Sequence, residues 1–315
     1  MTEMIVPKDH QHWLTLRSFD VTSTECAALF DASPYLTKFE LWHAKKDQSI
    51  DTIAENERMK WGKRLEAVIA EGVAQDQGWV IKKFDAYARN SELRLGSSFD
   101  YMISDKERGV GILEIKNVDR LVYKNYWNDG LEAPAHIELQ VQHQMLVAGY
   151  KWCAIVCLIG GNETNIIYRN ADPDIQIEIM KKARDFWSSI DFNQPPKADY
   201  SQDADYIIRN LRGQANENEF LDATGNVELA ELIRQYKFAA SERDSMESVV
   251  KQYRAQILEH IGAASVVVGE GYKISAGMVK DSVGTLVTPD MVGTYINARK
   301  GYRGFRINMK EMVNV

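Results

Sequence analysis

The sequence predicts an α/β protein in which helices flank a mixed central sheet. Two helical segments come first, at residues 13 to 47 and 55 to 77. Three runs rich in β-branched and aromatic residues follow at 79–88, 93–103 and 110–118, which is typical of consecutive strands. A helix at 134–149, two strands at 152–161 and 164–170, and a helix at 173–190 complete the order. This order of helices and strands is typical of a layered α/β domain.

Local signals place the boundaries of these elements. Ser33-Pro34 interrupts the first helical segment, and Gly78 supplies a stop for the second. Pro134 opens the helix at 134–149 and Gly149 closes it. Apolar residues at near-helical spacing mark the buried side of the second helix: Met59, Leu65, Ile69 and Val73.

The last third of the chain reads as an extension of this domain. We expect a first domain at 1–192, a polar linker at 193–226 and a C-terminal part at 227–315. The C-terminal part begins with a long helix at 227–261, whose narrow apolar stripe favours packing on one side, in a helical hairpin or an oligomer seam. A small β-rich tail follows at 264–315, and its seven basic and four acidic residues give it a net charge of +3.

Composition narrows the class of protein. The chain has 315 residues, of which 45% are hydrophobic and 26% charged, as in ordinary globular proteins. Neither a signal peptide nor an 18-residue apolar run occurs, and three cysteines fit a reducing compartment, so we expect a cytoplasmic protein without membrane contact. A net charge of −7 argues against a protein that simply coats nucleic acid.

One group of charged residues is suited to catalysis. The strand at 110–118 places Glu114 and Lys116 on the same face, because side chains alternate along a strand. Asp100 ends the preceding antiparallel strand, so a hairpin would bring all three together. Two converging carboxylates are the oxygen ligands that Mg²⁺ or Mn²⁺ prefers, and the lysine can orient a water or stabilise charge on a phosphodiester. The alternative is a pair of solvent-facing charges on an edge strand.

Further polar residues are weaker candidates. Glu66 lies within the second helix and could be a third acid of the site; the alternative is an ordinary solvated surface charge. Gln140 shares a helical face with His143 and Gln144, and this cluster could hold a phosphate or a water; the alternative is an ordinary polar helix face. Cys153 and Cys157 lie in an apolar run, which favours a buried strand over a metal site.

Taken together, these residues resemble the PD-(D/E)XK nuclease superfamily and, within it, the phage lambda exonuclease and YqaJ-like viral recombinase family. The resemblance covers about 12 to 190 in the family's order. Its motifs are Trp61-Gly62 with Glu66, Ser98-Phe99-Asp100, Glu114-Ile115-Lys116, Gln140-Val141-Gln142, and an opening stretch from Leu16-Arg17-Ser18 to Glu25. The sequence departs from the pattern at Phe99 and Tyr101, where the superfamily often has Pro and Gly.

The resemblance implies a restriction-endonuclease-like core and a Mg²⁺-dependent deoxyribonuclease that degrades one strand of linear duplex DNA from 5′ to 3′. The resulting 3′ overhang would serve a single-strand annealing partner in phage-type recombination, in a bacterial cell and from a phage or prophage gene. It also implies a homo-oligomer, a ring and possibly a trimer. The implied site residues are Asp100, Glu114 and the Ile115 carbonyl as metal ligands, Glu66 at a second ion, Lys116 and Gln140 at the attacking water, and Arg17 with Ser23 at the 5′-phosphate.

Two alternatives stay open. One is an endonuclease of restriction or junction-resolving type on the same core, although the Arg17 and Ser23 region favours recognition of an end. The other is a catalytically silent DNA-binding scaffold, against which the presence of Asp100, Glu114 and Lys116 argues.

Overall fold

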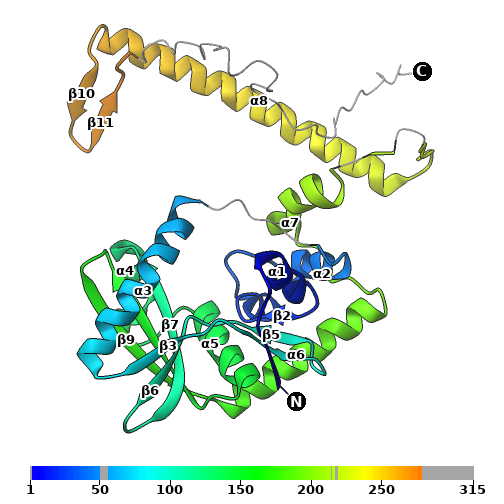
Figure 1. The fold of residues 1–315 in the computed structure, drawn as a ribbon. Helices are drawn as coiled ribbons and strands as arrows, with labels where there is room; N and C mark the ends of the chain where they lie inside the picture. Colours follow the sequence, from blue (N-terminus) through cyan, green and yellow to red (C-terminus); the bar gives the residue numbers. More distant parts are fainter. Residues whose placement is uncertain (1, 50–55, 214, 217–218, 279–315) are drawn as a thin grey trace, which may run out of the picture. The chain divides into compact units, whose positions relative to one another are not determined.

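A computed structural model of the chain describes residues 2–49, 56–213, 215–216 and 219–278. The chain divides into two compact units, Met1–Ile207 and Ile208–Val315, so the first domain extends beyond residue 192 (Figure 1). The first unit contains two sheets, and the second contains a long helix and a hairpin.

A five-stranded mixed sheet forms the centre of the first unit. Its strand order is β3-β6-β7-β8-β9, with bounds Val80–Lys83, Tyr101–Asp105, Gly109–Val118, Trp152–Ile159 and Glu163–Asn170. Only β7 and β8 of this sheet run parallel. A parallel pair needs a crossover, and here the crossover consists of α4 (Arg120–Tyr126), a 3₁₀ turn at Asn128–Gly130, and α5 (Ala135–Ala148). The predicted mixed sheet flanked by helices is confirmed.

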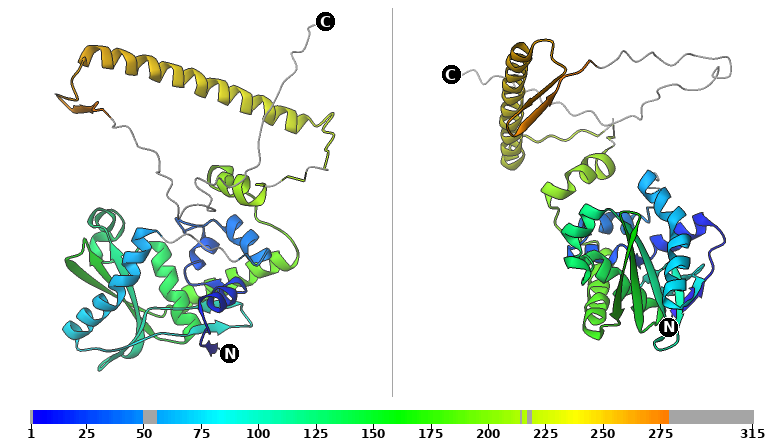
Figure 2. Two further views of the ribbon diagram at one scale, coloured as in Figure 1. Left: turned by 45° about the horizontal axis from the view of Figure 1, so that its top comes forward. Right: turned by 90° about the vertical axis from the view of Figure 1, so that its left-hand side faces the viewer.

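Helices cover both faces of this sheet, as Figure 2 shows. On one face, α3 (Glu57–Gln77) packs its apolar side on Leu113 of β7 and Ala154 of β8. On the other face, α5 packs on Ile112 and Ile155 of the same two strands. Because β7 is buried on both faces, a charged residue within it needs a partner in the protein.

A second sheet lies beside the first. Its order is β1-β4-β5-β2, with bounds Thr2–Ile5, Tyr87–Asn90, Leu95–Ser97 and Val21–Thr22. Four helical segments complete this region: α1 (His10–Ser18), a 3₁₀ helix at Cys26–Phe30, α2 (Lys38–Lys46) and α6 (Pro173–Asp191). A shared apolar core joins this sheet to α2, α5 and α6.

The predictions of single strands at 79–88 and 93–103 are wrong. Each run is split between the two sheets, as β3 with β4 and as β5 with β6. The rings of Phe84 and Phe99 stack at 3.8 Å between their centroids at this crossing, and the Phe84 N–H donates to the Asp100 carbonyl over 3.1 Å. The two chain segments therefore pass from one sheet to the other side by side. Asp100 lies at this crossing, directly before β6.

The predicted linker at 193–226 begins too early. Residues Tyr200–Tyr206 form α7, which contacts α2, and a π-helical turn follows at Ile207–Leu211. The Thr37 hydroxyl donates to Asp203 over 2.6 Å, and Asp203 also caps the start of its own helix by accepting from the Asp199 N–H. These bonds satisfy a carboxylate that is 1% exposed, which explains how a polar sequence packs on the first unit.

The second unit contains α8 (Val227–Ile261) and a hairpin of β10 (Val266–Gly269) and β11 (Tyr272–Ser275). The Asn226 side chain accepts from the Leu229 N–H and caps the helix, which confirms the predicted long helix. The hairpin confirms the start of the predicted β-rich tail, and residues 279–315 of that tail lie outside the described residues. Among the helices that the structure describes, none is long and apolar enough to cross a membrane.

Candidate active site

The site is built on β7, where side-chain alternation holds as predicted. Leu113 points to the α3 side of the sheet, whereas Glu114 and Lys116 point to the α5 side. Glu114 is 3% exposed although it is a carboxylate. A solvent-facing edge strand is therefore excluded, because β7 pairs on both sides and its acid is buried.

Asp100 reaches the same strand from the neighbouring one. Strands β6 and β7 are antiparallel with Tyr101 opposite Leu113, so Asp100 lies next to Glu114 and Ile115. The Ile115 N–H donates to the Asp100 carboxylate over 2.7 Å. This backbone bond fixes one carboxylate oxygen at the position where the predicted hairpin places it.

Three side chains donate to the two oxygens of Glu114. Lys116 Nζ lies 2.6 Å from Oε1, and Gln140 Nε2 lies 2.7 Å from the same atom. Gln144 Nε2 lies 2.7 Å from Oε2. Lys116 also donates to Gln140 Oε1 over 3.1 Å. Since α5 presents Gln140 and Gln144 one turn apart, both oxygens of the buried carboxylate are held in fixed directions.

The pKa shifts of Asp100 and Lys116 reflect two carboxylates buried close together. Burial raises the pKa of Asp100 well above its ordinary value, and the Glu114 charge raises it further, against the opposing effects of the Ile115 N–H and of Lys116. Burial alone would lower the pKa of Lys116, but the adjacent Glu114 outweighs it and raises that pKa. A cation beside the two carboxylates would therefore be strongly favoured.

The donors present suit one hard divalent ion. Mg²⁺ takes one or two carboxylates and keeps several waters, so Asp100, Glu114 and the Ile115 carbonyl are a sufficient set. The Glu114 charge raises the pKa of Asp100, as expected where a bound cation would compensate both carboxylates. Among the described residues, no group of three or more His, Cys, Asp or Glu side chains is close enough to hold a metal. The carbonyl and waters would thus complete the coordination.

Two predicted candidates have other hydrogen-bond partners. Glu66 pairs with Lys83 at 3.2 Å, and its charge is a minor contribution to the raised pKa of Asp100. His143 turns away from Gln140 and Gln144, and its Nε2 lies 3.2 Å from the Val21 carbonyl. The predicted shared face of α5 therefore holds for the two glutamines and fails for the histidine. Cys153 and Cys157 are buried in β8, as predicted.

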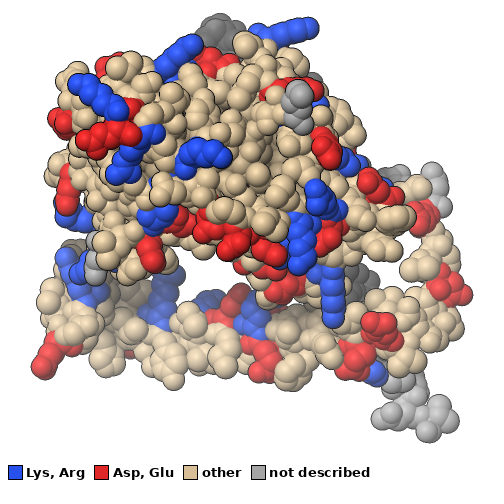
Figure 3. Space-filling model, turned by 90° about the horizontal axis from the view of Figure 1, so that it is seen from below, with Lys and Arg blue, Asp and Glu red and all other residues tan. Residues whose placement is uncertain are grey.

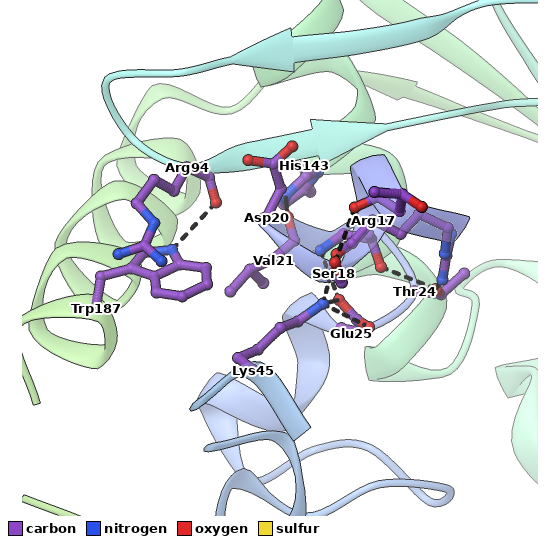
Figure 4. A network of polar contacts seen from close by, with 12 residues as sticks. Arg17, Ser18, Asp20, Val21, Thr24, Glu25, Lys45, Arg94, His143 and Trp187 are labelled. Atoms are coloured by element: carbon purple, nitrogen blue, oxygen red, sulfur yellow. Dashed lines mark hydrogen bonds and ion pairs between the residues drawn. The ribbon is translucent and has the colours of Figure 1, made fainter. Parts of the chain in front are cut away.

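A second polar network contains Arg17 (Figure 4). Arg17 Nη2 lies 3.3 Å from the Thr24 hydroxyl, and its guanidinium lies 4.5 Å from the Trp13 ring. Ser23, which the resemblance implies as the partner of Arg17, is buried at 3% exposure. The structure thus places Thr24, one residue further on, beside Arg17.

Buried Lys45 and its partner Glu25 support this network. Lys45 is 6% exposed and its Nζ donates to the Arg17 carbonyl over 2.8 Å and pairs with Glu25 at 2.8 Å. Burial would raise the pKa of Glu25, but Lys45 and Arg17 outweigh it and lower that pKa. Glu25 also accepts from the Thr22 N–H over 2.8 Å. The turn between α1 and the 3₁₀ helix is therefore fixed on both sides of Thr24.

A cavity of about 540 Å³ connects the two networks. Thr24 lines one part of it, and Lys116 with Gln140 line another. Tyr35 and His136 form part of its wall and contact each other edge to face at 5.7 Å. The volume is in the usual range for a small-molecule or nucleotide site, and the wall offers aromatic rings on which a base can stack.

Charges of both signs are mixed on the face of the molecule that Figure 3 shows. On the face that Figure 3 shows, acidic and basic side chains are interspersed among uncharged residues. Neither sign dominates on this face, so its charge does not mark a binding site.

The sheet, the flanking helices and the converging Asp100, Glu114 and Lys116 define an α/β protein of the restriction-endonuclease-like class. Residues 12–151 match the family model of the YqaJ-like viral recombinase domain. This part of the first unit is therefore similar to the YqaJ-like viral recombinase domain, as the sequence motifs predict.

Solved structures support the same fold. An alkaline exonuclease (LHK-Exo) from Laribacter hongkongensis is 18% identical, with a TM-score of 0.50, over 58% of this chain and 94% of that one. The LHK-Exo complex with dAMP is 17% identical, with a TM-score of 0.50, over 64% and 98%. None of the curated proteins compared with the chain matches it. The domain match and the fold together support a nuclease.

Proposed function

We propose that this protein is a divalent-metal-dependent exonuclease that degrades one strand of linear duplex DNA from 5′ to 3′. The observation that carries the proposal is the convergence of Asp100, Glu114 and Lys116 beside a cavity that also reaches Thr24. The YqaJ-like viral recombinase match supports a role in recombination, in which a 3′ overhang is passed to a single-strand annealing protein. It also supports a phage or prophage origin.

In this proposal Asp100, Glu114 and the Ile115 carbonyl hold Mg²⁺ or Mn²⁺. When bound, the ion activates a water and offsets the charge that develops on the scissile phosphate. Lys116, whose Nζ donates to Glu114, orients the attacking water beside the ion. Gln140 bonds to both Glu114 and Lys116, so it keeps the two at a fixed separation.

The 5′ end is recognised at the Arg17 network. A guanidinium is suited to a terminal phosphate because it donates several parallel hydrogen bonds, which an ammonium does not. Thr24 is the hydroxyl that joins it, in place of Ser23, because Thr24 both contacts Arg17 and lines the cavity. A site for the end of the strand favours an exonuclease over an endonuclease.

We also propose a second ion and a ring-shaped assembly, as the resemblance to the family implies. A second ion would require Glu66 to exchange its ion pair with Lys83 for the metal. A ring-shaped homo-oligomer, possibly a trimer, would keep the enzyme on its DNA. The mass of the full chain at working concentration tests the ring directly, because a monomeric mass rules it out.

The experiment compares linear duplexes that carry a 5′-phosphate or a 5′-hydroxyl, each labelled at the opposite end of the same strand, with closed circular DNA. We expect progressive shortening from 5′-phosphorylated ends in Mg²⁺ and none in EDTA. Lys116→Ala should lose this activity, whereas Lys106→Ala, a matched change in the exposed β6–β7 turn, should keep it.

Other outcomes point to other functions. Nicking of closed circles would indicate the endonuclease instead. Binding of DNA without any cleavage in Mg²⁺ or Mn²⁺ would indicate the silent scaffold. Shortening that begins at 3′ ends would contradict the proposed polarity and leave the nuclease in place.

A further inference from the structure

The long helix α8 exposes a continuous apolar seam. None of its 35 residues is buried. Four apolar side chains near its C-terminal half are 46–66% exposed: Met246, Val250, Tyr253 and Ile257. A helix of this kind normally depends on packing of its apolar side, because propensity alone contributes little. The seam is therefore a candidate interaction surface.

The spacing of the seam indicates what kind of partner fits. The four residues are separated by 4, 3 and 4 positions, which is the alternating a and d pattern of a coiled coil. This narrow stripe suits one further helix better than a sheet or a globular surface. The seam residues Val250, Tyr253 and Ile257 also form one wall of a groove of about 650 Å³ between α8 and the end of β11.

We propose that α8 pairs with α8 of a second copy of this chain, in antiparallel orientation. The two-fold axis passes between positions 251 and 252 of each helix. Val250 then lies opposite the partner's Tyr253, and Met246 opposite the partner's Ile257. Each pair occurs twice, so eight apolar side chains close one continuous core.

Charge supports this register. Glu247 and Arg254 occupy the same flanking position of successive heptads, next to the seam. In the antiparallel register each Glu247 faces the partner's Arg254, which gives two opposite-charge pairs. Within the described part of the chain, Arg254 forms no ion pair, and Glu247 only a long one of 3.9 Å to Arg243. Both charges are thus available for a partner helix.

Other arrangements place like charges together. Sliding the antiparallel pair by one heptad sets Glu247 opposite the partner's Glu247, and sliding it the other way sets Arg254 opposite the partner's Arg254. A parallel pair in register places Arg243 against the partner's Arg243 within the seam, with Glu242 facing the partner's Glu247. Like charges at these positions select against the wrong pairing.

Disulfide trapping in the full chain tests the pairing. One version carries Met246→Cys and another Ile257→Cys, with tags of different size. Oxidation of the mixture should give a disulfide between the two versions, since facing positions of this kind bring Cα atoms within about 7 Å. Each version alone should stay unlinked. The natural cysteines Cys26, Cys153 and Cys157 are buried, so they add little background.

Matched variants sharpen the test. Ser248→Cys lies on the opposite side of α8 from the seam and should not crosslink. Val250→Glu, added to both cysteine versions, should abolish the mixed disulfide. Glu247→Arg or Arg254→Glu alone should weaken self-association about tenfold, and the double reversal should restore it.

The results separate this contact from a ring formed by the nuclease units, because the disulfide reports on α8 alone. Circular dichroism of each variant would show that the helices are kept. A disulfide formed by Met246→Cys chains with one another would indicate parallel pairing and overturn the proposal. Failure of the mixed disulfide to form while the fold is intact would also overturn it, and would point to another occupant of the seam.

Discussion

Replacing Gln144 with Met should slow DNA cleavage while leaving the fold intact. Gln144 is fully buried, and its Nε2 donates to Glu114 Oε2 over 2.7 Å. Met has a similar length and volume but no donor, so Glu114 loses one of its three side-chain partners. In our account, this carboxylate holds the metal, and its direction depends on those donors.

The structure sets the size of the effect. A hydrogen bond to a charged group contributes about 1.5–3 kcal/mol, and about 1.4 kcal/mol corresponds to a factor of ten. The rate of cleavage or the metal affinity should therefore fall by roughly 10- to 150-fold. Stability should fall by less than this amount, because the Gln144 Oε1 atom is buried without a partner and its removal offsets part of the cost of the lost bond.

Gln142 is the matched control for this experiment. It lies on the same helix, is 3% exposed, and bonds the Asn170 carbonyl and the Asp172 N–H, each over 2.9 Å. Gln142→Met should lower the urea midpoint and leave single-turnover cleavage at saturating Mg²⁺ nearly unchanged. Equal activity losses in both variants, or full activity of Gln144→Met, would refute the role assigned to the bond with Glu114.

Three further predictions concern other parts of the first unit. Thr24→Val should reduce the preference for 5′-phosphorylated over 5′-hydroxyl ends, and Arg17→Lys should reduce it more, in a competition assay; an unchanged preference in both would remove the end-binding role. Glu66→Gln should weaken Mn²⁺ binding at a second site in calorimetry, and unchanged stoichiometry would restrict the enzyme to one ion. Burial lowers the pKa of His143 to about 4, below about 6.5 in the unfolded chain, so stability should be fully present above pH 6.5 and fall by about 3 kcal/mol as the pH drops to 4. Urea unfolding at pH 7 and 5 checks this slope, and His143→Gln should lack it.

Much of the site could be predicted from local patterns. The period of two along β7 places Glu114 and Lys116 on one side, and the hairpin brings Asp100 to them, because both relations are fixed by strand geometry. The period of α5 likewise predicts that Gln140 and Gln144 share a face. It does not show that His143, only three residues from Gln140, turns to the Val21 carbonyl.

The remaining features depend on contacts between distant segments. Thr24 and Ser23 are adjacent hydroxyl residues, and the direction in which Arg17 reaches decides between them. The division of the 79–103 region between two sheets follows from packing at Phe84 and Phe99, which strand propensity does not encode. Likewise, the polar sequence of α7 does not predict a packed helix, because the partner of its buried Asp203 carboxylate is the distant Thr37 hydroxyl.

The central claim is that Asp100 and Glu114 form the metal site of a nuclease. Single-turnover cleavage of a 5′-phosphorylated linear duplex by the wild-type chain and Asp100→Asn, in Mg²⁺ and in EDTA, tests it most directly. The account predicts cleavage by the wild-type chain in Mg²⁺ alone and a loss of at least about 100-fold in the variant. Cleavage that persists in EDTA, or an Asp100→Asn chain as fast as the wild type, would contradict it.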